Sequence, residues 1–184
     1  GEGGMVLCDD DALAERCRAL RNLCFVPERR FVHHELGYNF RMTNIQAALG
    51  VAQLEKIEAT LEKKRAIGAR YQELLKDVRG AQLPLERTPY AENLYWVFGL
   101  VLDDDVPFKE QECERRFQAL GVGTRPFFWP MHEQPVFMRQ AMFAGERYPV
   151  AERLARRGLY IPSGVALTEK QMEFVAQKVK DVIS

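Results

Sequence analysis

Apolar residues recur at the three- and four-residue spacing of an amphipathic helix along much of the chain. Leu13, Cys17 and Leu20 follow an acidic run that suits a helix N-terminus, so they predict a helix to about residue 22. Similar stripes predict further helices, which begin at Thr43, Ile57, Pro107, Pro149 and Thr168. The helices at Thr43 and Thr168 start with a Thr-x-x-Gln capping box, which satisfies free backbone N–H groups.

Shorter apolar runs predict strands between these helices. The run at 95–102 is apolar and aromatic enough for a buried strand. Further strands are expected at 5–8, at 122–128 and in the sequence LYIPSG that begins at Leu159. This order of elements predicts an α+β fold, a small mostly antiparallel sheet with helices packed on it. Gly50 lies inside a predicted helix, where glycine costs about 1 kcal/mol relative to alanine, so we expect close packing there.

Composition and charge are those of an ordinary globular protein. The chain has 184 residues, which suits one domain or a large piece of a longer protein, and 47% of them are hydrophobic. Lys+Arg and Asp+Glu both number 26, so the zero net charge argues against nucleic-acid binding. No apolar run approaches the roughly 18 residues of a membrane span. The cysteines form no C-x-x-C pair and no signal peptide is visible, which predicts free thiols in the cytoplasm.

A long loop at 25–39 leads into the first motif of interest, GYNFRMTN. Within it, Asn39 and Arg41 lie just before a predicted helix start. An amide, a planar guanidinium and a helix N-terminus all suit a phosphate. The alternative interpretation is a loop packed by Tyr38 and Phe40, with Arg41 in a surface ion pair.

A second motif, GVGTRPFFWPMHEQP, combines Arg125 and His132 with three aromatic residues and with prolines that keep the backbone extended. A histidine there can hold a hydroxyl or a phosphate oxygen. The alternative is an aromatic core cluster with a satisfied histidine. The adjacent His33 and His34 would point to opposite faces of a strand, and no Asp, Glu or Cys cluster completes a site, so we expect no metal.

Several long segments together resemble one enzyme family. They are GEGGMV, LGYNFRMTNIQAALGVAQLE, KKRAIGARYQELL and VGTRPFFWPMHEQPVF. The chain resembles the pyridoxal-phosphate-dependent sugar aminotransferases of the DegT/DnrJ/EryC1/StrS group over nearly its whole length. The segments PERRFVHHELGYNFRMTNIQ and TRPFFWPMHEQP are most similar to the perosamine synthase branch, which aminates C4 of a GDP-bound 4-keto-6-deoxy sugar.

The resemblance implies the aspartate-aminotransferase fold in a homodimer with shared active sites. Residues 1–42 would form the end of the large cofactor-binding domain, and 43–184 the small C-terminal domain. The chain resembles only the C-terminal half of the family, so the Schiff-base lysine is expected upstream of Gly1. The chain has its own lysines, but they lie in charged, helical contexts where we expect exposure, so none is expected to replace it.

The resemblance also implies roles for single residues. Asn39 would bind the phosphate of pyridoxal 5'-phosphate in the neighbouring subunit, and Arg41 would reach the phosphate of the substrate or the same pocket. His132 would lie near the sugar nucleotide, with Arg125 as a further substrate contact. The aromatic residues at 127–129 would line the sugar-nucleotide end of the site, with only one or two rings facing the ligand. Phe40 stands where the family commonly has tyrosine.

The expected function is therefore amination of a nucleotide-linked keto sugar, with glutamate as the amino donor. A dTDP- or UDP-linked keto sugar is an alternative substrate. A binding or assembly module without chemistry of its own is the alternative from another class. In either case the resemblance predicts that this chain by itself is inert.

Overall fold

The computed structural model of the chain describes residues 2–184. It divides into two compact units, one that ends at Ile57 and one that runs from Glu58 to Ser184. The domain boundary expected between residues 42 and 43 stays a prediction. Within the described residues, no helix combines the length and the apolar character needed to cross a membrane.

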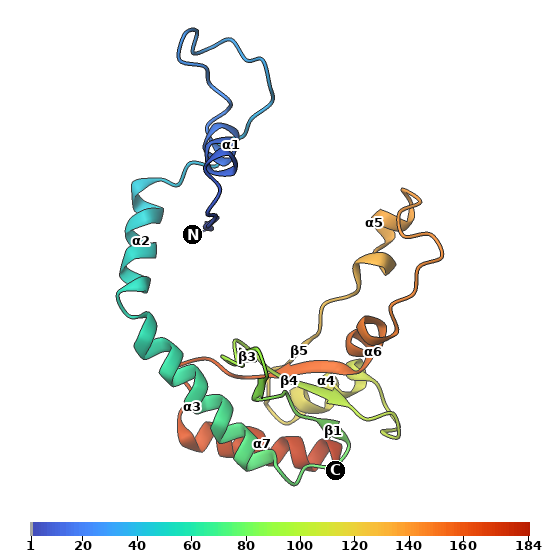
Figure 1. Cartoon of the computed structure of the whole chain (residues 1–184). Helices are drawn as coiled ribbons and strands as arrows, with labels where there is room; N and C mark the ends of the chain where they lie inside the picture. The colour runs from blue at the N-terminus through green and yellow to red at the C-terminus, as the bar shows by residue number, and fades with distance from the viewer. Residues whose placement is uncertain (1) are drawn as a thin grey trace. The chain divides into compact units, whose positions relative to one another are not determined.

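The first unit contains two of the predicted helices (Figure 1). Helix α1 (Asp11–Arg21) begins after Asp10, whose carboxylate accepts a hydrogen bond from the Leu13 N–H at 2.7 Å. Helix α2 (Asn44–Leu54) begins after Thr43 with the complete capping box that the sequence predicts. Both helix starts are confirmed, because capping depends only on residues close together in the chain.

Two expectations for the first unit are wrong. Residues 5–8 form no strand, and their apolar side chains are 73–88% exposed at Met5, Val6 and Leu7. A strand requires a neighbour to pair with, and nothing in the described chain pairs with this segment. Gly50 is not closely packed either, since a Cβ added there would meet nothing within 4 Å.

The predicted loop at 25–39 is present and its base is closed by backbone hydrogen bonds. The Leu23 N–H donates to the Tyr38 carbonyl at 3.0 Å, and Asn22 and Asn39 form an isolated β-bridge. Within the loop, the rings of Phe25 and Phe31 meet edge to face, 6.0 Å apart. The closed base fixes where the GYNFRMTN segment leaves the loop.

The second unit is built on a four-stranded antiparallel sheet, which confirms the predicted fold class (Figure 1). Its strands lie in the order β1 (Ala81–Gln82), β4 (Phe98–Leu102), β6 (Gly158–Ile161), β5 (Arg125–Pro126). A separate hairpin consists of β2 (Arg87–Thr88) and β3 (Ala91–Glu92). The sequence did not predict β1 or this hairpin.

Helices cover one face of the sheet and enclose the core. They are α3 (Ile57–Leu75), α4 (Glu110–Ala119) and α7 (Glu169–Ile183), the last of which begins with the predicted capping box. Helix α6 (Pro149–Arg157) contacts β4 and β6. The short 3-10 helix η1 (Met131–Glu133) and helix α5 (Pro135–Met138) belong to the long connection before α6.

Two predicted strands are shorter than expected. The run at 95–102 becomes a strand only from Phe98, because Tyr95 takes a left-handed backbone conformation with φ of 50°. The run at 122–128 is reduced to Arg125–Pro126. Pro126 has no N–H to donate to a neighbouring strand, which limits how far the pairing can extend.

The buried hydroxyl of Tyr71 gives a prediction for the stability of the second unit. Its side chain is fully buried and its hydroxyl donates to the Pro162 carbonyl at 2.9 Å. Burial raises the pKa of this hydroxyl, so it stays a donor. Tyr71→Phe should lower the free energy of unfolding by about 1–2 kcal/mol, because the half-buried Pro162 carbonyl loses its partner. Urea titration measures this, with Tyr90→Phe, an 88% exposed tyrosine, as the neutral control; equal effects would contradict the assignment.

Candidate functional site

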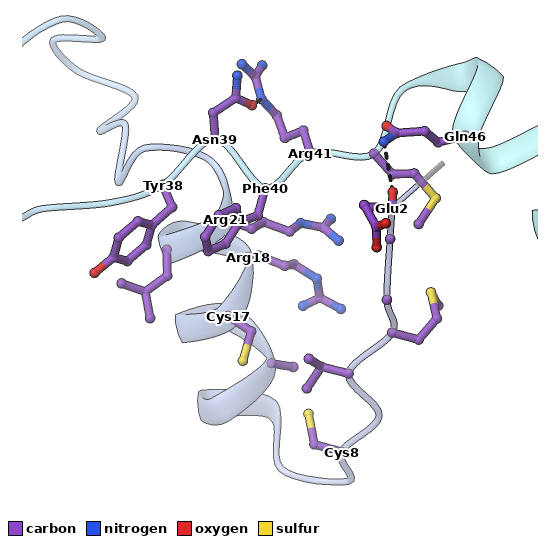
Figure 2. A pocket seen from close by; sticks show the side chains of 17 residues that line it. Glu2, Cys8, Cys17, Arg18, Arg21, Tyr38, Asn39, Phe40, Arg41 and Gln46 are labelled. Atoms are coloured by element: carbon purple, nitrogen blue, oxygen red, sulfur yellow. Dashed lines mark hydrogen bonds between the residues drawn. The ribbon is translucent and has the colours of Figure 1, made fainter. Parts of the chain in front are cut away.

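A cavity of about 850 Å³ in the first unit contains both residues that the resemblance assigns to the GYNFRMTN motif (Figure 2). It lies between the N-terminal segment, α1 and the segment that leads into α2. Its lining residues are Glu2, Gly3, Gly4, Met5, Val6, Cys8, Ala14, Cys17, Arg18, Leu20, Arg21, Tyr38, Asn39, Phe40, Arg41, Met42 and Gln46.

Asn39 and Arg41 form a pair at the rim of this cavity. The Arg41 Nε–H donates to the Asn39 amide oxygen at 3.3 Å, so the amide NH₂ group of Asn39 stays free to donate. Both side chains are exposed. The structure therefore brings together the amide and the guanidinium that the motif predicted, with their N–H groups available to an anion.

Arg18 and Arg21 also line the cavity, and the sequence did not single them out. They lie one turn apart on α1, and Figure 2 shows their guanidinium groups on the opposite side of the 38–41 segment from the Asn39 amide and the Arg41 guanidinium. Arg18 is paired with Glu15 at 2.5 Å. The Arg21 guanidinium has no hydrogen bond or ion pair with any described residue. The signal in the sequence was the three-residue spacing of two basic residues on one helix face.

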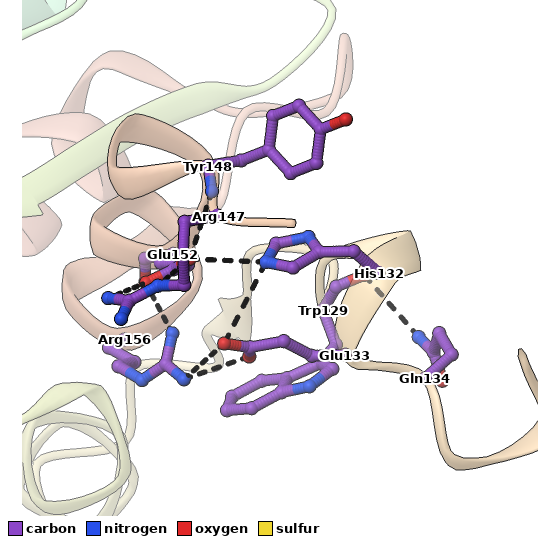
Figure 3. Close-up of polar contacts among 8 residues, drawn as sticks. All are labelled: Trp129, His132, Glu133, Gln134, Arg147, Tyr148, Glu152 and Arg156. Atoms are coloured by element: carbon purple, nitrogen blue, oxygen red, sulfur yellow. Dashed lines mark hydrogen bonds and ion pairs between the residues drawn. The ribbon is translucent and has the colours of Figure 1, made fainter. Parts of the chain in front are cut away.

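His132 lies in the second unit, in a group of charged residues that we call the polar cluster (Figure 3). Its members are His132, Glu133, Arg147, Glu152 and Arg156. The His132 Nε2 atom is 3.2 Å from a Glu152 oxygen, and the ring meets the Tyr148 ring edge to face at 4.9 Å. The imidazole is only 7% exposed, which matches the alternative interpretation of a satisfied histidine.

Glu152 is the centre of the polar cluster. It accepts two hydrogen bonds from Arg147, at 3.1 and 3.0 Å, and one from the Tyr148 backbone N–H at 3.0 Å. These donors, with His132, lower the pKa of the Glu152 carboxyl from its ordinary 4.5 to about 2. The carboxylate therefore holds the connection before α6 against the first turn of that helix.

The polar cluster does not suit a metal ion, although His132, Glu133 and Glu152 offer ligand atoms within 4.8 Å of one another. Arg156 contacts both oxygens of Glu133, at 2.7 and 2.8 Å, and Arg147 contacts both oxygens of Glu152. Each carboxylate already has an arginine in contact with both of its oxygens, so a metal ion would first have to displace an arginine.

A second cavity, the aromatic pocket, has a volume of about 360 Å³. Its lining residues are Trp96, Val97, Phe127, Phe128, Pro130, Ala151, Leu154 and Tyr160. The structure thus separates the aromatic residues at 127–129, which were predicted to line the sugar-nucleotide end of the site. Phe127 and Phe128 enter this pocket, whereas the Trp129 ring packs on the Arg156 guanidinium at 4.9 Å. Trp96 and Tyr160 were not predicted, because only strand pairing brings them here.

Arg125 and Lys64 complete the description of the second unit. Arg125 is exposed on β5, directly opposite Tyr160 of β6. Lys64 corrects the expectation of exposed lysines, because it is only partly exposed. Its Nζ atom donates to the carbonyls of Ser163 and Trp96, at 2.5 and 3.0 Å. Burial lowers the pKa of this lysine, but its donors are all directed at neighbouring oxygens.

Comparison with known sequences identifies the same family as the motifs. The profile of the DegT/DnrJ/EryC1/StrS aminotransferase family matches residues 1–180. GDP-perosamine synthase of Caulobacter vibrioides is 31% identical over 183 residues, and that of Vibrio cholerae is 30% identical over 184. These alignments cover 100% and 98% of the chain but 48% of each relative, so the chain spans about half the length of the curated relatives it matches.

Solved structures agree with this assignment. DesV of S. venezuelae, determined in complex with a ketimine intermediate, is 27% identical and superposes with a TM-score of 0.79 over 94% of this chain and 44% of its own. TlmJ, an aminotransferase of Streptoalloteichus hindustanus, is 26% identical with a TM-score of 0.79 over 94% of this chain and 45% of its own. The fold is thus that of the C-terminal part of a sugar aminotransferase.

The low pKa of Glu152 leads to a prediction for the polar cluster. Glu152→Gln removes the charge that Arg147 and His132 contact, so the variant should be less stable than the wild type at pH 7. A carboxyl with a lowered pKa stabilises the fold fully above pH 4.5 and loses this contribution as the pH falls toward 2.

The measurement is the free energy of unfolding of both proteins between pH 7 and pH 3, by urea titration. The stability difference should be constant above about pH 4.5 and shrink below it. Glu62→Gln, an exposed carboxylate of the same unit, serves as the control. A difference that stays constant down to pH 3 would show that the lost charge was not the cause.

Proposed function

Because the chain belongs to the DegT/DnrJ/EryC1/StrS aminotransferase family, we propose that the whole protein is a pyridoxal-phosphate-dependent aminotransferase that aminates C4 of a nucleotide-linked 4-keto-6-deoxy sugar. The family match across 1–180 carries this proposal. The GDP-perosamine synthases among its relatives favour a GDP-linked sugar, with a dTDP- or UDP-linked sugar as the alternative. Glutamate is the proposed amino donor.

The residues of the first unit fit the phosphate of pyridoxal 5'-phosphate. Asn39 has a free amide NH₂ group beside the Arg41 guanidinium, and both are exposed. In the proposal, Asn39 donates to the cofactor phosphate, while Arg41 orients the Asn39 amide and offers its remaining N–H groups to the phosphate of the substrate. When bound, the cofactor supplies the electron sink for amino transfer.

We further propose that His132 and Arg125 serve the substrate in different ways. Arg125 is exposed and unpaired within the described residues, so its guanidinium is available to an anion. His132 is held by Glu152 at 3.2 Å. It would therefore act on the sugar only from a fixed position, as a donor or acceptor whose ring cannot turn freely.

A homodimer is part of the proposal. Helix α2 has no buried residue, and its apolar side chains Ile45, Leu49, Val51 and Leu54 are all more than half exposed. Exposed apolar surface of this kind supports association. In the proposed dimer, Asn39 serves the active site of the neighbouring subunit.

We also propose that the enzyme acts in the cytoplasm.

The direct test uses the complete protein that contains this chain. It is incubated with glutamate and with GDP-, dTDP- and UDP-linked 4-keto-6-deoxy sugars, and the products are analysed by mass spectrometry. We expect an amino sugar from the GDP-linked substrate. No amination of any of the three would overturn the proposed function.

The lysines of this chain give a second prediction. None is expected to hold the cofactor covalently. Lys64, the one with a lowered pKa, already donates to two carbonyls. We expect no specific adduct when the chain is reduced with borohydride in the presence of pyridoxal phosphate and analysed by peptide mass spectrometry. A stoichiometric adduct on one lysine would contradict this.

The Asn39–Arg41 pair gives a further prediction. In the complete protein, Asn39→Ala and Arg41→Ala should weaken cofactor or substrate binding at least several-fold. Both residues are exposed, so stability should change by no more than about 0.5 kcal/mol. Arg29→Ala removes an exposed arginine from the same loop and should change neither. Unchanged affinity with lowered stability would instead support a structural role for the pair.

A further inference from the structure

The sheet of the second unit has two unlike faces, because side chains alternate along a strand. On β6, Leu159 and Ile161 are at most 1% exposed and point into the core. Gly158 and Tyr160 point to the other face. On β4, Gly99 lies directly opposite Tyr160 and shares that second face. Each central strand thus places a glycine on the face that the core helices leave uncovered.

Phe127 uses the space above these glycines. A Cβ at Gly99 would come within 2.7 Å of the Phe127 ring, and one at Gly158 would overlap that ring. The ring therefore lies directly against the backbone of both strands. It lines the aromatic pocket, and the centre of the Tyr160 ring lies 6.4 Å from its own.

Trp96 is presented at the edge of the pocket by a strained residue. Tyr95 has a φ of 50°, which is unfavourable for a residue with a Cβ. This conformation turns the Tyr95 ring into the core, where it is 5% exposed and stacked on Phe98 at 5.8 Å. The next side chain, Trp96, consequently points outward and is 75% exposed.

Contacts from other elements hold this arrangement. The Tyr95 N–H donates to the Asn93 side-chain oxygen at 2.8 Å, and Lys64 donates to the Trp96 carbonyl at 3.0 Å. Gly68 of α3 leaves room for the Tyr95 ring, which a Cβ at that position would overlap. Strain that several groups maintain often marks a functional position. Here its visible result is an indole exposed beside an aromatic pocket.

We propose that the aromatic pocket binds the nucleobase of the sugar nucleotide by stacking, chiefly on Trp96, and that Arg125 binds its phosphates. This inference rests on the proposed function. The pocket volume of about 360 Å³ lies in the range of small-molecule sites, roughly 300–1,000 Å³. Arg125 lies directly opposite Tyr160 in the pairing of β5 with β6, so its side chain shares the face that Tyr160 occupies. A cation beside aromatic rings complements a nucleotide, which has both a flat ring and negative charge.

The lining of the pocket also determines how selective it is. It contains no carboxylate and no side-chain amide, the side-chain groups that read the hydrogen-bonding edge of a base. Stacking tolerates any base because every base has a π-face. The pocket should therefore bind GDP, dTDP and UDP with affinities within about tenfold of one another, with the purine tightest because its face is largest.

The experiment measures nucleotide binding to the full chain by tryptophan fluorescence. The chain has two tryptophans, Trp96 and Trp129. Trp129→Phe leaves Trp96 as the only reporter, and this protein is titrated with GDP, dTDP, UDP and inorganic diphosphate. We expect saturable quenching by all three nucleotides, and at least tenfold weaker binding of diphosphate, which has no base to stack.

Two variants locate the site. Trp96→Ala should weaken GDP binding roughly tenfold or more, measured by calorimetry, and Trp96→Phe should restore most of the affinity because it keeps a ring. Trp96 is exposed, so both variants should fold. Trp129→Ala is the matched control and should leave GDP binding unchanged. Equal GDP affinity of wild type and Trp96→Ala, or no nucleotide binding by the chain, would overturn the inference.

These outcomes separate the inference from the function on which it rests. If the complete protein aminates a nucleotide-linked sugar but Trp96→Ala binds GDP normally, the base lies elsewhere and the proposed function stands. If the chain binds all three nucleotides through Trp96 but the complete protein aminates no sugar, the pocket assignment stands and the proposed function fails.

Discussion

The antiparallel pairing of β4 with β6 determines the rest of the second unit. This register places Phe98 opposite Ile161 and Leu100 opposite Leu159, all on the face that α3, α4 and α7 cover. Burial of these side chains supplies the main stabilising free energy. The same register necessarily aligns the residues between them on the opposite face. The core and the aromatic pocket therefore both depend on this one pairing. A shift of the register by one residue would turn the side chains of the shifted strand from one face of the sheet to the other.

The charged residues of the polar cluster satisfy one another locally. In the polar cluster, two carboxylates meet two arginines and one histidine, and each arginine binds its carboxylate through two contacts. Such a cluster holds its side chains in fixed orientations rather than offering a reactive group, because few of its donors and acceptors remain free. Asn39 and Arg41 of the first unit differ, since they contact each other and leave several N–H groups exposed.

Much of the fold could be predicted from the sequence because its signals are local. The helix starts at Thr43 and Thr168 follow from capping boxes that span four residues. The aromatic pocket could not be predicted in this way. Trp96 and Tyr160 are far apart in sequence, and they meet only through strand pairing and a left-handed turn at Tyr95. Lys64 was misjudged for the same reason, since its acceptors lie on distant segments.

The contact between Gly68 and the Tyr95 ring couples two positions that are 27 residues apart in the numbering. Any larger residue at 68 would need a smaller one at 95, and a small residue at 95 would remove the stacking partner of Phe98 that anchors the turn. Sequences that diverge from this one should therefore change at 68 and 95 together or at neither. The outward direction of the Trp96 indole therefore depends on this pair, and so on helix α3 as well as on the sheet.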